Sequence, residues 1–117
     1  MGDVKKIQKA ARKGRFLLPK SIIKSDAFLH MSGRALKVYL WMVAQYDGQN
    51  NGALTAVYRD LMAQCGLTKW AVGIALDELL CSGFVRVTRK GGSDGGAFVP
   101  SLYAITAPKL PIDYAGA

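Results

Sequence analysis

The stretch that decides the fold is LTKWAVGIALDELLCSGFVRVTRK, residues 67–90. Thr68 is a good N-cap for a helix, because its hydroxyl can accept a hydrogen bond from a free backbone N–H of the first turn. Apolar residues then recur at the spacing of a helix with one buried side, and we expect this helix to end near Ser82. Gly83 follows at the position where a left-handed residue closes a helix. Residues 84–89 are rich in β-formers and predict a strand.

Upstream of this stretch, a second helix is expected at about 57–64. Gly66 stands just beyond it and can close it, so a tight turn would join the two helices. Residues 32–46 predict an earlier helix with serine as its N-cap and apolar residues around much of its circumference. The Asp, Gly and Asn residues of 47–52 then turn the chain, and we expect a very short strand at 53–54.

Downstream, residues 101–106 predict a second strand. The segment between the two strands holds four glycines between 91 and 96, so we expect an antiparallel hairpin with a long, flexible tip. The tail from Ala107 contains prolines and should be irregular. Before the first long helix, 21–23 and 25–29 predict one or two short helical turns.

The net charge of +8 is unevenly placed along the chain. Residues 1–24 carry eight basic groups against one acid, and the other 93 residues carry eight against seven. This asymmetry indicates a polyanionic partner, either nucleic acid or an anionic membrane surface. We expect a basic flexible arm at 1–15, one folded domain at 16–106 and an irregular tail at 107–117. The apolar stripe of the arm is too thin for membrane attachment.

Several function classes find no support in the sequence. Cys65 and Cys81 lie inside apolar patterns without the spacing of a metal or redox pair, and we expect buried, reduced thiols. The single histidine, His30, has no evident catalytic partner and is expected to pack or cap locally. The glycine cluster lacks the residues of a phosphate-binding loop. No apolar run is long enough to span a bilayer, so we expect a cytoplasmic protein that is not an enzyme and uses no metal or cofactor.

The order of helix, short strand, helix, glycine turn, helix and hairpin is that of a winged helix. Residues 67–90 resemble the recognition helix and first wing strand of winged-helix proteins such as the MarR-like regulators. The stretch from Phe16 to Thr106 is similar to small winged-helix proteins of phages and plasmids, including N-terminal domains of replication initiators. The resemblance implies an α+β fold, a winged helix-turn-helix with three main helices plus a C-terminal antiparallel β-hairpin wing. The residues that carry it are Leu67, Thr68, Val72, Leu76, Leu79, Gly83, Phe84 and Val85.

In such a fold the third helix enters the major groove and presents its N-terminal side chains to base edges. Lys69 can contact phosphate or guanine, and Thr68 offers a hydroxyl together with helix N-terminal amides. The outward positions of this helix are Thr68, Lys69, Trp70, Gly73, Ile74 and Asp77. The wing would add Arg86, Arg89 and Lys90. The arm would add Lys5, Lys6, Lys9, Arg12, Lys13 and Arg15 along phosphates.

These residues predict a sequence-specific binder of double-stranded DNA, a phage- or plasmid-type transcriptional regulator or replication-origin binder. The sequence leaves open whether it acts as a homodimer on two half-sites or as a monomer. It departs from a strong DNA reader because Ile74 stands where related proteins often carry a basic residue. Trp70 and Ile74, four residues apart, would form an exposed apolar pair. The alternative is therefore a protein-interaction module that binds a host or replication partner through this pair.

Overall fold

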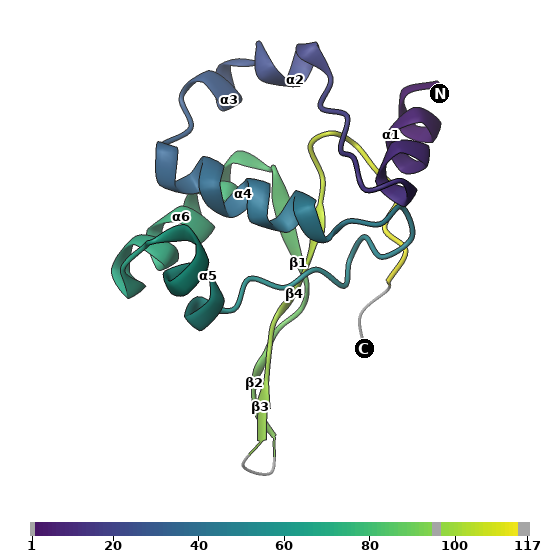
Figure 1. Cartoon of the computed structure of the whole chain (residues 1–117). Helices are drawn as coiled ribbons and strands as arrows, with labels where there is room; N and C mark the ends of the chain where they lie inside the picture. Colours follow the sequence, from purple (N-terminus) through teal and green to yellow (C-terminus); the bar gives the residue numbers. More distant parts are fainter. Residues whose placement is uncertain (1, 95–96, 115–117) are drawn as a thin grey trace.

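The computed structural model describes residues 2–94 and 97–114, where helices are followed by an antiparallel hairpin (Figure 1). The α+β class expected from the sequence is confirmed. The helices are α1 (Gly2–Arg12), α2 (Lys20–Ile23), α3 (Asp26–Leu29), α4 (Gly33–Gln45), α5 (Tyr58–Cys65) and α6 (Lys69–Ser82). The strands are β1 (Val85–Arg89), β2 (Gly92–Asp94), β3 (Ala97–Val99) and β4 (Leu102–Ile105).

Helices α4, α5 and α6 begin and end within about a residue of the expected positions, and capping residues set four of these six limits. The Ala35 N–H donates to the Ser32 hydroxyl at 3.2 Å, and the Ala71 N–H donates to the Thr68 hydroxyl at 3.1 Å. Each hydroxyl satisfies a backbone donor that has no partner within the helix. Gly66 follows the last residue of α5 and Gly83 follows the last residue of α6, and both adopt the left-handed conformation, with φ of 67° and 78°.

The core lies where α4 and α6 pack together against β1 and β4. In Figure 1, α4 runs across the middle of the molecule, with α2 and α3 above it and α5 below it. Tyr39 and Met42 of α4 and Leu79 of α6 are fully buried. The Phe84 ring meets the Tyr39 ring edge-on at 5.5 Å between centroids. Because one face of α6 is buried in this core, its orientation is fixed.

The hairpin is longer and more regular than the sequence suggests. β1 pairs with β4, and the pairing then continues outward from Gly92↔Val99 to Asp94↔Ala97, so ordered strands replace much of the expected flexible tip. A Cβ at Gly91 would clash with the Val99 carbonyl oxygen, so only glycine allows the two strands to approach there. Gly95 and Gly96 lie outside the described residues. Figure 1 shows the hairpin projecting away from the helices.

The outer edge of β4 is paired by residues from the loop after α4. Tyr103 exchanges two backbone hydrogen bonds with Leu54, at 2.8 and 3.1 Å, which is the very short strand pairing expected near 53–54. Asn51, fully buried, continues this edge with its side chain: it accepts from the Ile105 N–H at 2.7 Å and donates to the Ile105 carbonyl at 2.9 Å. The Asn51 carbonyl also accepts from Asp113 and Tyr114, so the irregular tail is anchored.

The prediction of a flexible arm at residues 1–15 is wrong, because Gly2–Arg12 forms helix α1. Ile7 and Ala11 are only 3% and 6% exposed, and they join the same apolar cluster as Leu110 of the tail. Phe16, just beyond α1, meets the Tyr46 ring edge-on at 6.1 Å. A stripe too thin to hold a helix in a membrane is therefore enough to hold one on a protein surface, where packing supplies the stability.

Glu78 connects α6 to the start of α4, and its removal should destabilise the fold. Its carboxylate accepts from the Ser32 N–H at 2.6 Å and from the Ser32 hydroxyl at 2.7 Å. Glu78→Ala leaves both donors without this acceptor, so we expect the free energy of unfolding to fall by about 1–3 kcal/mol. Urea unfolding measures it, and Asp77→Ala, at the exposed neighbour, should change it by less than about 0.5 kcal/mol. Equal urea midpoints for the two variants would contradict this role.

Candidate nucleic-acid interface

The first turns of α6 face solvent, as the sequence predicts. Thr68 and Lys69 are exposed, and Trp70 is 69% exposed although tryptophan is usually largely buried. Asp77 is exposed two turns further along the same helix, whereas Gly73 and Ile74 are half-buried. The opposite side of α6 is covered by the core. This geometry leaves a short, mixed basic and aromatic surface at the N-terminus of a firmly held helix.

Arg34, in the first turn of α4, holds the Trp70 ring. Its guanidinium carbon lies 5.6 Å from the ring centroid, within the range of a cation–π contact. The Arg34 Nε is buried and has no hydrogen-bond partner among the described residues. The sequence gives no signal for this pair, because the two residues lie on different helices. A second cation thereby stands beside Lys69 at the exposed end of α6.

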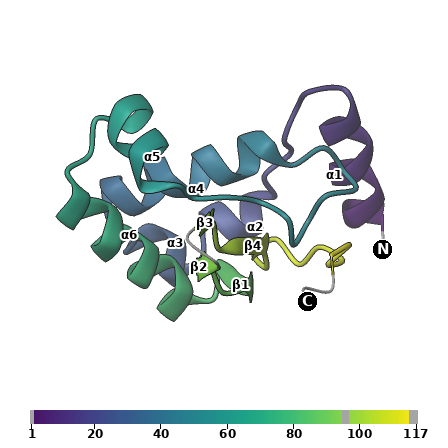
Figure 2. The same ribbon diagram turned by 90° about the horizontal axis from the view of Figure 1, so that it is seen from below.

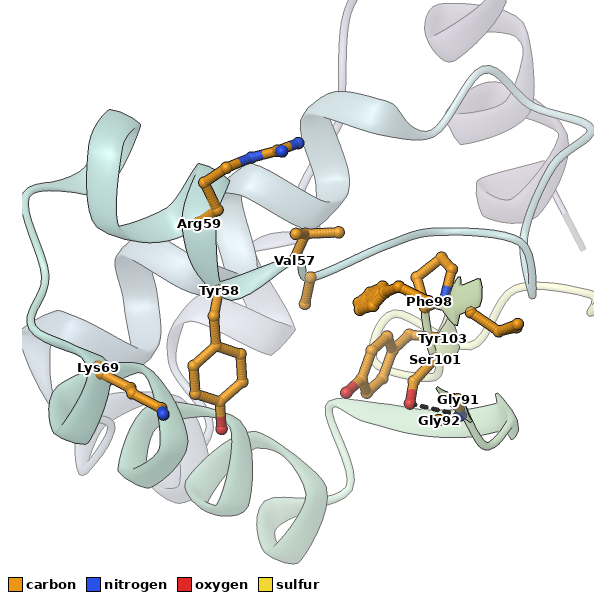
Figure 3. A pocket seen from close by; sticks show the side chains of 12 residues that line it. Val57, Tyr58, Arg59, Lys69, Gly91, Gly92, Phe98, Ser101 and Tyr103 are labelled. Atoms are coloured by element: carbon orange, nitrogen blue, oxygen red, sulfur yellow. Dashed lines mark hydrogen bonds between the residues drawn. The ribbon is translucent and has the colours of Figure 1, made fainter. Parts of the chain in front are cut away.

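An open groove of about 820 Å³ separates this end of the helices from the hairpin. Figure 3 shows Tyr58 and Lys69 on the helical side, across from Phe98 and Tyr103 on the hairpin side. Arg59 also lines the groove from the helical side. Phe98 is 69% exposed, and Tyr58 is 39% exposed. Among the described residues that line the groove none is acidic, and two are basic. An aromatic, cationic groove of this kind suits a polyanion that carries flat rings.

Two details fix the chemistry of the groove. Burial raises the pKa of Tyr103 above its ordinary value, so its phenol remains a neutral hydrogen-bonding group at physiological pH. A Cβ at Gly73 would lie 3.2 Å from the Tyr58 hydroxyl, so the glycine makes room for that phenol beside α6. Gly73, expected on the outward side, thus contributes space to the groove.

The three basic residues expected on the wing have different surroundings. Arg86 and Lys90 are exposed. Arg89 is half-buried, and one of its terminal nitrogens donates to the Pro100 carbonyl at 3.0 Å across the hairpin. None of the three lines the groove. Arg89 therefore braces the hairpin, and Arg86 and Lys90 are the cations that its surface presents.

The six basic residues expected on the arm are all exposed, but the structure does not bring them to α6. Figures 1 and 2 place α1 beyond one end of α4, whereas α5 and α6 lie at the other end. The structure thus has two separate basic surfaces, one toward each end of α4. One surface is formed by α6 with the hairpin. The other is formed by six residues of α1 and the segment that follows it, namely Lys5, Lys6, Lys9, Arg12, Lys13 and Arg15.

The remaining candidates have local roles or none. The expectation of buried thiols is wrong for Cys81, which is exposed, and only partly right for Cys65, which is half-buried. Cys81 lies on the outward side of α6, a side that its apolar neighbours in the sequence conceal. His30 is exposed, and its Nδ1 lies 2.8 Å from the Asp26 carbonyl at the end of α3, a local capping contact.

Sequence reasoning missed four residues of this surface: Arg34, Tyr58, Arg59 and Phe98. None of the four lies on α6. The only sequence signals for the two aromatic residues are the helical pattern around Tyr58 and the β-rich pattern around Phe98. Within the described residues, no helix is long and apolar enough to cross a membrane, and no three metal-ligating side chains gather. Comparison with protein-family models, curated proteins and solved structures finds no match to this chain.

Proposed function

We propose that this protein binds double-stranded DNA as a winged helix-turn-helix, with α6 in the major groove and the hairpin as its wing. The role would be that of a phage- or plasmid-type regulator of transcription or an origin binder in replication. The observation that carries the proposal is the exposed first turn of α6, where Lys69 and Trp70 stand beside a groove without acids. Binding alone, without catalysis, is the proposed activity.

Physical dimensions support this arrangement. The major groove of B-DNA, about 12 Å wide, admits a helix, and the free N–H groups at a helix N-terminus attract phosphate. Lys69 adds a full charge at that end, and Trp70 can contact thymine methyl groups or sugars. The groove between α6 and the hairpin would then receive one strand of the backbone. Arg59 is mostly free to help, because its side chain is 86% exposed and its pair with Asp60 spans 3.5 Å.

Selection of bound fragments from random duplexes, followed by titration against salt, tests the proposal. We expect one family of sequences to bind at least about 1000-fold more tightly than random duplex. The spacing of selected half-sites will show whether one chain or two read the site, since a dimer reads half-sites about ten base pairs apart. Equal affinity for selected and random duplexes at physiological salt would overturn sequence-specific binding.

Phe98→Ala should separate the hairpin's contribution from that of α6. Because Phe98 is 69% exposed, its removal should leave the thermal midpoint nearly unchanged. We expect the affinity for the selected duplex to fall about tenfold, by loss of a contact between the ring and the nucleic acid, measured by fluorescence anisotropy. Leu29→Ala is the matched control, because Leu29 is 66% exposed on α3. Equal losses in the two variants would show that the hairpin takes no part.

A protein partner is the second candidate, and the exposure of Trp70 favours it. Large exposed aromatic residues are common at the centres of protein interfaces. Ile74 contributes less to such a patch than the sequence suggested, because it is half-buried. A partner bound in this way should be retained at high salt and lost in Trp70→Ala, whereas DNA binding should weaken steeply with salt.

A further inference from the structure

Helix α1 carries a cationic face that the proposed DNA site leaves unused. We define it as Lys5, Lys6, Lys9, Arg12 and Lys13, all exposed. At about 100° per residue these positions point away from the buried Ile7 and Ala11, so they share one side of the helix and the turn that follows it. Because the buried side is packed on the domain, the charges are held in a fixed array.

No carboxylate forms an ion pair with this array within the described residues. The one ion pair found there joins Arg59 to Asp60, at the other end of the molecule. Asp3 is the only acid in the first 24 residues, and it lies at the start of α1. Five unpaired cations within roughly 12 Å of helix form a strong attraction for a polyanion.

The position of the face decides which polyanion it can meet. A duplex seated on α6 and the hairpin would lie at the far end of α4 from α1 (Figures 1 and 2). DNA is stiff on the scale of this molecule, whose longest dimension is 45 Å. A duplex that lies across the α6 end of α4 therefore does not reach α1 without a sharp bend, and in that orientation the cationic face remains free when α6 is occupied.

We propose that the cationic face of α1 binds the backbone of a second DNA duplex, so that one chain bridges two duplexes. This inference rests on the proposed function for the first duplex. A 12 Å length of duplex carries about seven phosphates, which matches the five cations closely enough for several simultaneous contacts. The face offers charge and no groove-entering element, so this second contact is independent of base sequence.

A capture assay tests the bridge. One selected duplex is fixed to beads, the protein is added, and a fluorescent random duplex is then offered at low salt. The wild-type chain should hold the fluorescent duplex on the beads. The variant Lys5→Gln with Lys9→Gln and Lys13→Gln should stay bound to the fixed duplex but retain less than about a tenth of the second, because glutamine keeps the helix and removes the charge.

A matched pair of single reversals controls for net charge. Lys9→Glu should weaken capture of the second duplex about tenfold. Lys24→Glu changes the charge equally at an exposed position that follows α2, and it should change capture less than about twofold. Circular dichroism checks that α1 remains helical in each variant.

Three results would overturn the bridge. The first is capture that survives the triple glutamine variant. The second is that the wild-type chain binds the fixed duplex but captures no second duplex. This result overturns the bridge also where the chain binds vesicles that contain phosphatidylserine. The third is capture that sedimentation assigns to a dimer, with two α6 surfaces each holding a duplex. If the proposed function itself fails, the selected duplex will not bind in preference to random DNA, a distinct outcome.

Discussion

Asn51→Ala is expected to lower the free energy of unfolding by about 2–5 kcal/mol and the thermal midpoint by about 10 °C or more. Asn51 is fully buried, and its side chain satisfies the N–H and the carbonyl of Ile105 on the edge of β4 that faces away from β1. Its amide also donates to the Pro111 carbonyl at 3.1 Å. Alanine leaves these buried backbone groups without partners, and an unpaired buried group costs about 1–3 kcal/mol.

Urea unfolding of Asn51→Ala beside Asn50→Ala checks this expectation. Asn50 forms comparable bonds within its own turn, to Gln45 and Asp47, but it is half-buried, so water can replace them. We expect Asn50→Ala to cost no more than about 1 kcal/mol. If the two alanine variants unfold at the same urea concentration, the Asn51 side chain does not carry the edge of β4.

Asn51→Asp adds a pH dependence with a definite sign. Burial would raise the pKa of the new carboxyl above its unfolded value of about 3.9, and the nearby Asp113 carboxylate, which accepts the Asn51 N–H at 3.1 Å, would raise it further. The folded state would then hold more protons than the unfolded state, so the variant should lose stability as the pH rises above about 4. Over the same range the wild-type chain has no such group at this position.

Local signals explain why the helices around α6 were predictable. Ser32, Thr68, Gly66 and Gly83 act within a turn of their own positions, and the spacing of apolar residues shows which side of α6 is buried. The exposure of Lys69 and Trp70 follows from the same spacing. These features need no knowledge of the rest of the chain.

Features that depend on distant residues were not predictable in the same way. Helix α1 is stabilised by packing on the tail and on the turn after α4, where a Cβ at Gly48 would lie 2.8 Å from the Gln8 carbonyl. The sequence alone shows only a thin apolar stripe among charges, which also fits a disordered arm. The glycines of the hairpin are similarly ambiguous, since close strand approach and flexibility both favour glycine.

The Asn51 amide and the groove are further cases of this kind. A buried asparagine in a turn sequence reads as a turn residue, and its pairing with Ile105, 54 positions away, appears only in the fold. The groove joins Tyr58 and Phe98, which belong to α5 and β3. The residues of α6 therefore predict only part of the surface proposed to contact DNA, and the rest of that surface comes from α5 and the hairpin.

Lys69→Ala combined with Trp70→Ala is expected to reduce affinity for the selected duplex about 100-fold. A base contact is worth about 1–3 kcal/mol at a DNA interface, and loss of a phosphate contact weakens binding to every sequence. These two side chains form the exposed first turn of α6. Folding should be unaffected, because both residues are exposed and the Thr68 cap remains. Anisotropy titrations at several salt concentrations measure the change.

The comparison is sharpest in a background where α1 already carries Lys5→Gln, Lys9→Gln and Lys13→Gln, because the cationic face would otherwise hold any duplex. There, Lys69→Ala should reduce the log–log salt slope by about one, and Trp70→Ala should weaken the preference for the selected sequence instead. Lys24→Ala with Leu29→Ala, a lysine and an apolar residue exposed near α2 and α3, is the matched control. If the α6 pair costs no more affinity than this control, α6 does not read DNA.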